Sequence, residues 1–319
     1  MSHDHEVRHL NNVSRRNLLK ASGISLGLTF FGSFNAESAF AATPSVRLAG
    51  FSSFADKVRV FKSSKYYLVE SDGMPSHNMM IGIKSWQQQV PTPQKYSGTN
   101  AWSIPIKPQI SPTPISAKGH FLRGAIALAV NGVPIFNALN NRGEDAFLAG
   151  ELDEWGGHCG RADDYHYHVA PFHLQSIVGK KSPIAYALDG FPIYGESEID
   201  GKKVVGLDSL NGHFDAKKNY HYHGTKTFPY INGGFKGVVS EVSGQVDPQA
   251  ATKAFRPAGE PLRGASITDF ERSSESSYRL TYSINNEKYL INYSIIDNSI
   301  HMQFTDPQGT TRTEVYQRS

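Results

Sequence analysis

The residues of this chain best suited to chemistry are histidines in a short phrase that occurs twice. Residues 165–168 and residues 220–223, 55 positions further on, both read Tyr-His-Tyr-His, and a Gly-His pair precedes each phrase at His158 and His213. Alternate residues of a β-strand face the same side, so each phrase presents two imidazoles together. A histidine returned by the loop would add a third nitrogen and leave one coordination position open, as in catalytic zinc and copper centres. The candidate metal ligands are therefore His158, His166, His168, His213, His221 and His223.

Two arrangements of these histidines fit the sequence equally well: one mononuclear site in each copy, or a single site on which both copies converge. Two interpretations without metal also stay open, namely a buried hydrogen-bonded Tyr/His core and a metal-free acid–base site. Neighbouring residues could add a ligand or, as outer carboxylates, fix the tautomers of the imidazoles. These additional candidates are His77, Asp153, Asp208, Asp164 and Asp189. No catalytic residue is assigned.

The duplication also includes the segment before each histidine phrase. Residues 127–136 align without gaps with residues 185–194, and each segment contains a turn dipeptide, Asn-Gly in the first and Asp-Gly in the second. Apolar runs on both sides of such a dipeptide predict a β-hairpin with a type I′ turn. The two copies, residues 122–173 and 182–236, therefore each offer a hairpin and a histidine strand. We expect them to share one core as a pseudo-symmetric pair.

The rest of the chain predicts further β-structure. Six prolines in the stretch 91–114 indicate an extended segment and not a helix. After residue 240, four runs alternate apolar and polar residues between turn signals, which predicts an antiparallel meander. These runs are Tyr278–Ile284, Tyr289–Ile296, Ser299–Phe304 and Thr311–Tyr316. We expect a mainly β protein, with the duplicated domain over residues 42–240 and a C-terminal meander extension over residues 241–319.

The N-terminal sequence predicts export. Arg15 and Arg16 belong to a stretch close to the twin-arginine consensus, an apolar run follows, and residues 39–41 form a small-x-small cleavage site. The apolar run has about 14 residues, whereas a membrane-spanning helix needs about 20. We expect residues 1–41 to be a signal peptide that the twin-arginine export machinery recognises. The mature chain would then be periplasmic or otherwise extracytoplasmic, with no membrane span.

The composition excludes several classes of protein. Cys159 is the only cysteine, so neither an intrachain disulfide nor a paired-cysteine zinc or iron–sulfur site can form. The formal net charge is +3 and no stripe of Lys and Arg is present, which gives no electrostatic case for nucleic acid. The signatures of serine hydrolases, zinc proteases, P-loop enzymes and dinucleotide-binding folds are absent. Five scattered methionines are too few for a Cu(I) chaperone.

The motifs of the central region resemble those of the YHYH-domain family, a group of exported bacterial proteins. The resemblance covers about residues 57–237 and includes both Tyr-His-Tyr-His phrases, Ser71–His77, Ala187–Gly195, Leu207–His213 and Phe228–Tyr230. Relatives often carry cysteines at the places of Trp155, Leu210 and Gly234, so the resemblance implies that apolar packing replaces a disulfide here. It implies the boundaries of the fold and the location of the site, but no reaction.

The sequence therefore predicts an exported, histidine-rich protein that binds copper or zinc. If the protein is an enzyme, the open coordination position favours metal-activated water for hydrolysis, or copper redox chemistry. The alternatives are a non-catalytic module that carries metal or binds an unknown small ligand between the copies, and a structural surface protein with a hydrogen-bonded Tyr/His core and no metal.

Overall fold

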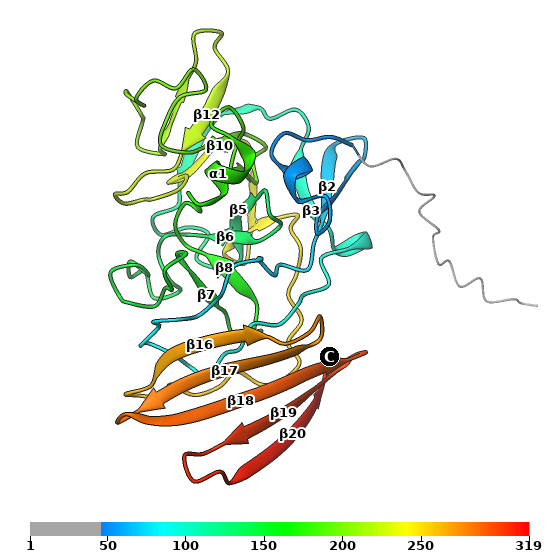
Figure 1. The fold of residues 1–319 in the computed structure, drawn as a ribbon. Helices are drawn as coiled ribbons and strands as arrows, with labels where there is room; N and C mark the ends of the chain where they lie inside the picture. The colour runs from blue at the N-terminus through cyan, green and yellow to red at the C-terminus, as the bar shows by residue number, and fades with distance from the viewer. Residues whose placement is uncertain (1–45, 319) are drawn as a thin grey trace, which may run out of the picture. The chain divides into compact units, whose positions relative to one another are not determined.

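The computed structural model describes residues 46–318, so the predicted signal peptide, residues 1–41, lies outside the described residues. The described chain is mainly β and ends in an antiparallel meander, which confirms the predicted fold class (Figure 1). Between residues 46 and 318, no helix combines the length and the apolar character needed to cross a membrane.

An eight-stranded sheet contains both histidine phrases, in the strand order β11-β12-β10-β9-β5-β6-β8-β7. The first copy supplies β5 (Ala125–Ala129), β6 (Pro134–Phe136), β7 (Gly157–Cys159) and β8 (Tyr165–Tyr167). The second copy supplies β9 (Ala185–Ala187), β10 (Pro192–Tyr194), β11 (Gly212–Phe214) and β12 (Tyr220–His223). Strands from corresponding parts of the two copies lie equally far from the centre of the sheet, where β5 pairs with β9.

The strand pairing joins the two copies into one sheet. β5 and β9 are antiparallel, with Leu128 opposite Tyr186, and this pairing joins the first copy to the second. All five residues of β5 are buried, as its unbroken apolar sequence Ala-Ile-Ala-Leu-Ala predicts for a central strand covered on both faces. Outward from the centre, β6 pairs in parallel with β8 and β10 pairs in parallel with β12. The innermost strand of each copy therefore forms its hydrogen bonds on one side with the innermost strand of the other copy.

Both predicted hairpins form, but their turns differ from type I′. That turn needs positive φ at both central residues, and only the glycine of each dipeptide has it, with φ of 82° and 96°. The residue before each glycine makes a tertiary hydrogen bond instead. Asn131 Nδ2 donates to the hydroxyl of Tyr167 (3.1 Å), and Asp189 Oδ2 accepts from the hydroxyl of Tyr222 (2.5 Å). Each turn is thus hydrogen-bonded to the second tyrosine of one phrase.

Smaller elements accompany the central sheet. A three-stranded antiparallel sheet precedes it and contains β1 (Arg59–Lys62), β2 (Tyr66–Glu70) and β3 (Trp102–Pro105). Two short sheets pair β4 (Ile110–Ser116) with β13 (Gly234–Gly237), and β14 (Ser240–Val242) with β15 (Gln245–Asp247). The helical elements are α1 (Leu174–Val178) and the 3-10 turns η1 (Phe51–Phe54) and η2 (Gly98–Asn100). The proline-rich stretch is accordingly extended, apart from η2.

The C-terminal meander has five strands, one more than predicted. They follow one another in chain order as β16 (Ser266–Arg272), β17 (Ser277–Ile284), β18 (Glu287–Ile296), β19 (Ser299–Thr305) and β20 (Thr311–Gln317). The additional strand, β16, pairs with β17 through an irregular register between Ile267 and Asp269. Its two buried residues, Ile267 and Phe270, are three positions apart because of this irregularity, so the sequence does not show the period of two on which strand prediction depends.

Several contacts join the C-terminal part of the chain to the segments around the first copy. Tyr293 of β18 donates its hydroxyl to the carbonyl of Pro91 (2.5 Å). Arg256, which precedes β16, forms a buried ion pair with Asp163 in the turn between β7 and β8, with Nε 2.7 Å from Oδ2. The meander is therefore attached close to the first histidine phrase. The domain boundary near residue 240 stays a prediction.

Candidate metal centres

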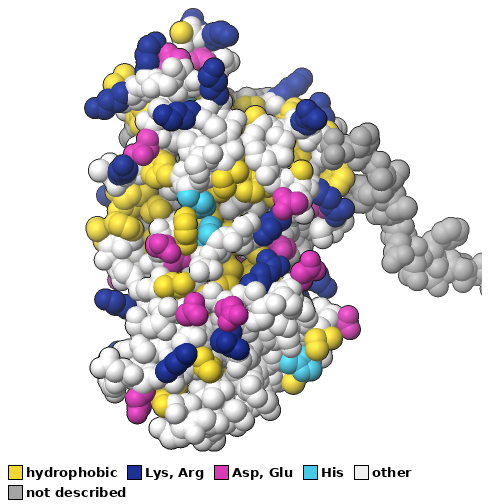
Figure 2. Space-filling view, in the orientation of Figure 1, with side chains coloured by type: hydrophobic (Ala, Val, Ile, Leu, Met, Phe, Trp, Pro, Cys, Tyr) yellow, Lys and Arg dark blue, Asp and Glu magenta, His cyan; other side chains and the backbone are white. Residues whose placement is uncertain are grey.

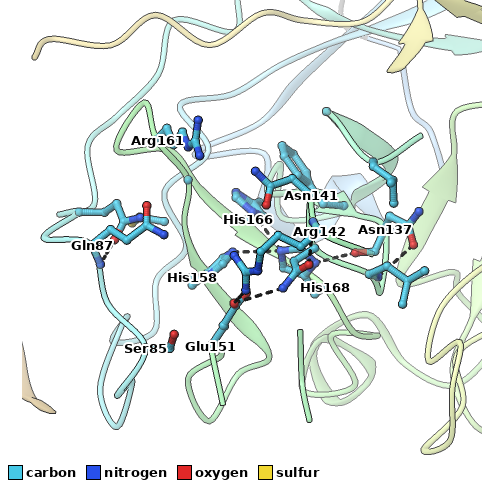
Figure 3. A pocket seen from close by; sticks show the side chains of 18 residues that line it. Ser85, Gln87, Asn137, Asn141, Arg142, Glu151, His158, Arg161, His166 and His168 are labelled. Atoms are coloured by element: carbon cyan, nitrogen blue, oxygen red, sulfur yellow. Dashed lines mark hydrogen bonds and ion pairs between the residues drawn. The ribbon is translucent and has the colours of Figure 1, made fainter. Parts of the chain in front are cut away.

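The first copy brings its three histidines into one group. Nε2 of His168 lies 3.0 Å from Nε2 of His158 and 3.2 Å from Nε2 of His166 (Figure 3). Two nitrogens on a tetrahedral ion with bonds of about 2.05 Å lie about 3.3 Å apart. The three nitrogens therefore already have nearly the spacing of ligands on one ion.

The strand register explains how the third histidine joins the pair. His166 is the middle residue of β8, and His168 directly follows the strand, so the two are alternate residues of one extended segment. His158 of β7 lies directly opposite His166. Side chains opposite each other on antiparallel strands have Cβ atoms about 5 Å apart, so their rings meet. The glycine before the third histidine is also required, since a Cβ on Gly157 would lie 2.5 Å from the hydroxyl oxygen of Tyr165, which packs against the other face.

Backbone carbonyls determine where the protons of the rings are. His168 Nδ1 donates to the carbonyl of Asn137 (2.6 Å), and His166 Nδ1 donates to the carbonyl of Asp164 (3.0 Å). A carbonyl oxygen only accepts, so a neutral ring bonded in this way has its proton on Nδ1 and a bare lone pair on Nε2. The contact between Nε2 of His166 and Nε2 of His168 consequently has no proton to share when both rings are neutral. Such lone pairs repel one another unless a cation lies between them.

Burial favours the neutral form of His158 and His168. It lowers the pKa of His158 well below the ordinary value and the pKa of His168 to about 3, and neighbouring imidazoles lower both further. A hydrogen bond of each ring to the backbone opposes this effect without overcoming it. Neutral imidazole is the form that binds metal. His158 and His168 are therefore in the form that could hold a metal ion.

The second copy assembles a corresponding group and adds a carboxylate. Nε2 of His213 and Nε2 of His221 are 3.0 Å apart. Glu198 reaches all three histidines, since its carboxylate oxygens lie 3.2 Å from Nε2 of His213 and 3.6 Å from Nε2 of both His221 and His223. Nδ1 of His213 and of His223 donates to a backbone carbonyl (3.1 and 2.8 Å). Burial lowers the pKa of His221 and of His223, as in the first copy.

Each group takes all its donor atoms from one copy, and the donor atoms of a group lie within 4.8 Å of one another. Of the two arrangements that the sequence left open, this is the one with a separate group in each copy. Cys159 is buried beside His158 and belongs to neither group.

Glu198 is the residue that the sequence reasoning missed. The hairpin alignment, continued four residues past its last position, places Glu198 at the position of Asn140 in the first copy. The structure supports this correspondence: the backbone N–H of Asn140 donates to the carbonyl of Glu144 (2.8 Å), and that of Glu198 donates to the carbonyl of Lys202 (2.9 Å). A single acidic residue in a polar loop has no spacing pattern of its own, so only the extended alignment could have found it.

The predicted outer carboxylates mostly hold tyrosines. Asp153, Asp208 and Asp189 each accept a hydrogen bond from a tyrosine hydroxyl of the two phrases, at 2.8, 2.9 and 2.5 Å. Asp164 is the exception, because its Oδ2 lies 3.5 Å from Nδ1 of His166. The imidazoles otherwise use backbone carbonyls, whose positions leave no trace in the sequence.

His77 lies beside the tyrosines and not among the three nitrogens of the first group. Its Nε2 is 2.7 Å from the hydroxyl oxygen of Tyr167, and its ring stacks on Trp155 with centroids 4.6 Å apart. Burial lowers the pKa of His77 to about 4. The structure thus places this residue on the opposite side of β8 from His166 and His168.

Each group borders a cavity. The cavity at the first group has a volume of about 170 Å³ and is lined by the three histidines and by Arg142, Glu151 and Arg161 (Figure 3). The cavity at the second group has a volume of about 530 Å³ and combines His221 with the half-exposed Phe214. Histidine side chains also come to the surface in the middle of the face shown in Figure 2, next to hydrophobic and charged side chains.

Residues 101–203 match the model of a family described as YHYH protein. The match includes the first histidine group and Glu198, and it ends before the histidines of the second group. It is shorter than the region over which the motifs resemble this family. No curated protein and no solved structure matches the chain.

Proposed function

We propose that this YHYH-domain protein is an exported metal-binding protein that holds one copper or zinc ion in each of its two histidine groups. The observation that carries the proposal is the convergence of three Nε2 atoms, at 3.0–3.2 Å in the first group, in which the Nδ1 atoms of His166 and His168 are already bonded to carbonyls. Imidazole nitrogens in this number suit both zinc and copper.

Three kinds of group in the chain would contribute to metal binding: histidine nitrogens, backbone carbonyls and one carboxylate. Three histidines in each copy supply the metal–nitrogen bonds, and the backbone carbonyls hold the rings in the tautomer that a metal requires. In the second copy Glu198 adds a negative charge. A bound ion with three imidazole ligands would keep a position for water or for another ligand, which is the chemistry such a centre supplies.

A metal-free hydrogen-bonded core is the main alternative, and the tautomers disfavour it. Nε2 of His166 and Nε2 of His168 would need a proton between them, but Nδ1 takes the only proton of each of these rings when it is neutral. A second proton would make the ring cationic, and burial lowers the pKa of His158 and His168 far below neutrality. A metal-free acid–base site has the same difficulty.

Export is the second part of the proposal. The twin-arginine stretch around Arg15 and Arg16 and the cleavage site at residues 39–41 support transport by the twin-arginine machinery to an extracytoplasmic location. This route carries folded proteins, so the histidine groups would receive their ions before or during export. The single cysteine fits an oxidising compartment, in which it has no partner within the chain.

Binding stoichiometry in histidine variants tests the proposal. Metal-free protein is titrated with Zn²⁺ and with Cu²⁺, and we expect two ions per chain. Either His166→Ala or His221→Ala should bind one ion with unchanged affinity, because each removes a ligand from one group only. The control is His301→Ala, a histidine of β19 outside both groups, which should still bind two.

The outcomes separate the alternatives. Wild-type protein that binds no ion, together with a lower melting temperature for His166→Ala, would establish the hydrogen-bonded core and overturn the metal proposal. A single ion per chain that is lost with either substitution would instead mean that both copies build one site.

A further inference from the structure

The two histidine groups differ in their fourth donor. In the second group the carboxylate of Glu198 lies within 3.6 Å of Nε2 of all three histidines. An ion bound there would have an anionic ligand from the chain itself. The first group consists of three imidazoles, and among residues 46–318 no carboxylate joins it at ligand distance.

Asn140 occupies the position of Glu198 in the first copy and is turned away from the imidazoles. Its Nδ2 donates to the carboxylates of Glu144 (3.0 Å) and Glu151 (3.2 Å), and its Oδ1 accepts from the backbone N–H of Arg142 (2.9 Å). All these bonds hold a buried amide in a fixed orientation. A rotation of the Asn140 side chain towards the imidazoles would therefore break these hydrogen bonds.

The space in front of the first group is a small cavity. Its volume of about 170 Å³ lies below the roughly 300–1,000 Å³ of sites for drug-sized ligands and well above the roughly 30 Å³ that one water occupies in the liquid. A molecule of a few heavy atoms fits this volume. Phe136, which stacks on His166 with centroids 3.8 Å apart, provides an apolar wall for a short aliphatic group.

One cation that lines this cavity, Arg161, has no carboxylate partner among residues 46–318. Arg142 and Arg161 both line it (Figure 3). Glu151 also lines it and forms an ion pair with Arg142 at 2.5 Å, and Arg142 pairs with Glu144 as well, at 2.7 Å. Arg161 forms no ion pair with any residue between 46 and 318, so its guanidinium is available to an incoming carboxylate, which it can bind through two parallel N–H donors.

The corresponding positions of the second copy carry the opposite charges. Where the first copy has Arg142 and Glu144, the second has Asp200 and Lys202 at the same distance along the alignment, and both pairs form an ion pair (2.7 and 2.6 Å). The order of cation and anion is thus reversed between the copies, and the net charge of the two positions is the same. Of the pair in the first copy, Arg142 lines the cavity and Glu144 does not.

From this internal comparison we infer that the first histidine group binds a small free carboxylate as the fourth ligand of its metal ion, in the place that Glu198 takes in the second group. The inference rests on the proposed metal binding. In the second group, Glu198 completes the coordination of the ion, so no ligand from solution is needed there. In the first group, the fourth coordination position is free for a ligand from solution.

Cobalt and acetate test the inference. The full mature chain is loaded with two Co²⁺ per chain as a spectroscopic substitute for zinc, and acetate is added while the visible d–d absorption is recorded. We expect a saturable change that involves half of the bound cobalt. In His221→Ala, which retains the first group, all bound cobalt should respond. In His166→Ala, which retains the second group, none should respond.

Two further variants make the test specific to the carboxylate. Asn140→Glu gives the first group the residue of the second, and it should bind cobalt with no response to acetate. Arg161→Gln changes an exposed residue that supports no other contact described above, and it should weaken acetate binding several-fold with unchanged cobalt content.

The failures are distinguishable. Protein that takes up no cobalt would refute the proposed metal binding itself. Two bound cobalt ions with no acetate response, as would follow if Glu151 left Arg142 and bound the metal, would overturn the inference and leave the metal sites standing. An equal response from both groups would also overturn it.

Discussion

Tyr165 and Tyr220 occupy the same place in the two copies, but their hydroxyls should contribute unequally to stability. Tyr165 donates to Asp153 Oδ2 at 2.8 Å, and Asp153 is only 7% exposed. Phenylalanine at position 165 would leave this buried carboxylate with only its backbone N–H donors, and losing a hydrogen bond to a buried charged group costs about 1.5–3 kcal/mol. Tyr220 donates to Asp208 at 2.9 Å, whose side chain is 36% exposed. Water can replace that hydroxyl, so Tyr220→Phe should cost less than about 1 kcal/mol.

Urea unfolding of the metal-free proteins measures this difference. We expect Tyr165→Phe to lower the free energy of unfolding by at least about 1 kcal/mol more than Tyr220→Phe. Metal content should be unchanged in both variants, because the tyrosines face the side of the strands opposite the histidines. Equal costs would refute the assignment of Asp153 as a buried acceptor. Loss of metal in either variant would refute the separation of the two faces.

Three other predictions concern the parts of the chain around the site. Arg256→Met should lower the free energy of unfolding by about 3–5 kcal/mol, because it leaves the buried Asp163 charged and unpaired; a second change, Asp163→Asn, should recover part of the loss in the same unfolding experiment. Burial lowers the pKa of His77 to about 4, so the native ring stays neutral while the unfolded chain takes up a proton below about pH 6.5. The contribution of His77 to stability is therefore complete above pH 6.5 and is lost as the pH falls towards 4, and His77→Gln should flatten the stability–pH curve in this window. Lysine in place of both Arg15 and Arg16 should keep the precursor inside the cell on fractionation, and normal accumulation of mature protein outside the cytoplasm would contradict the export signal.

Much of the fold was predictable because its patterns are local. The two hairpins, the histidine strands β8 and β12 and four strands of the meander all follow from period-two alternation and turn dipeptides. Strands β7 and β11 could not be predicted, since three residues are too few to show a period. The turn geometry also could not be predicted, because Asn131 and Asp189 adopt conformations set by hydrogen bonds to distant tyrosines.

The site was predictable as a set of residues but not as an arrangement. Spacing identified all six histidines, and strand geometry placed each His-x-His pair on one face. Whether the copies converge depends on strand order, which places β7 and β11 at opposite ends of the sheet. The carbonyl partners of the imidazoles are backbone atoms, so no residue type marks them. Glu198 became visible only when the copies were compared position by position.

Elemental analysis of protein purified after native export, combined with X-ray absorption at the edge of the metal found, tests the central claim most directly. The account predicts two ions of copper or zinc per chain, each bound by three imidazole nitrogens at about 2.0–2.1 Å. Protein that leaves the cell fully folded and stable without a stoichiometric metal would contradict it.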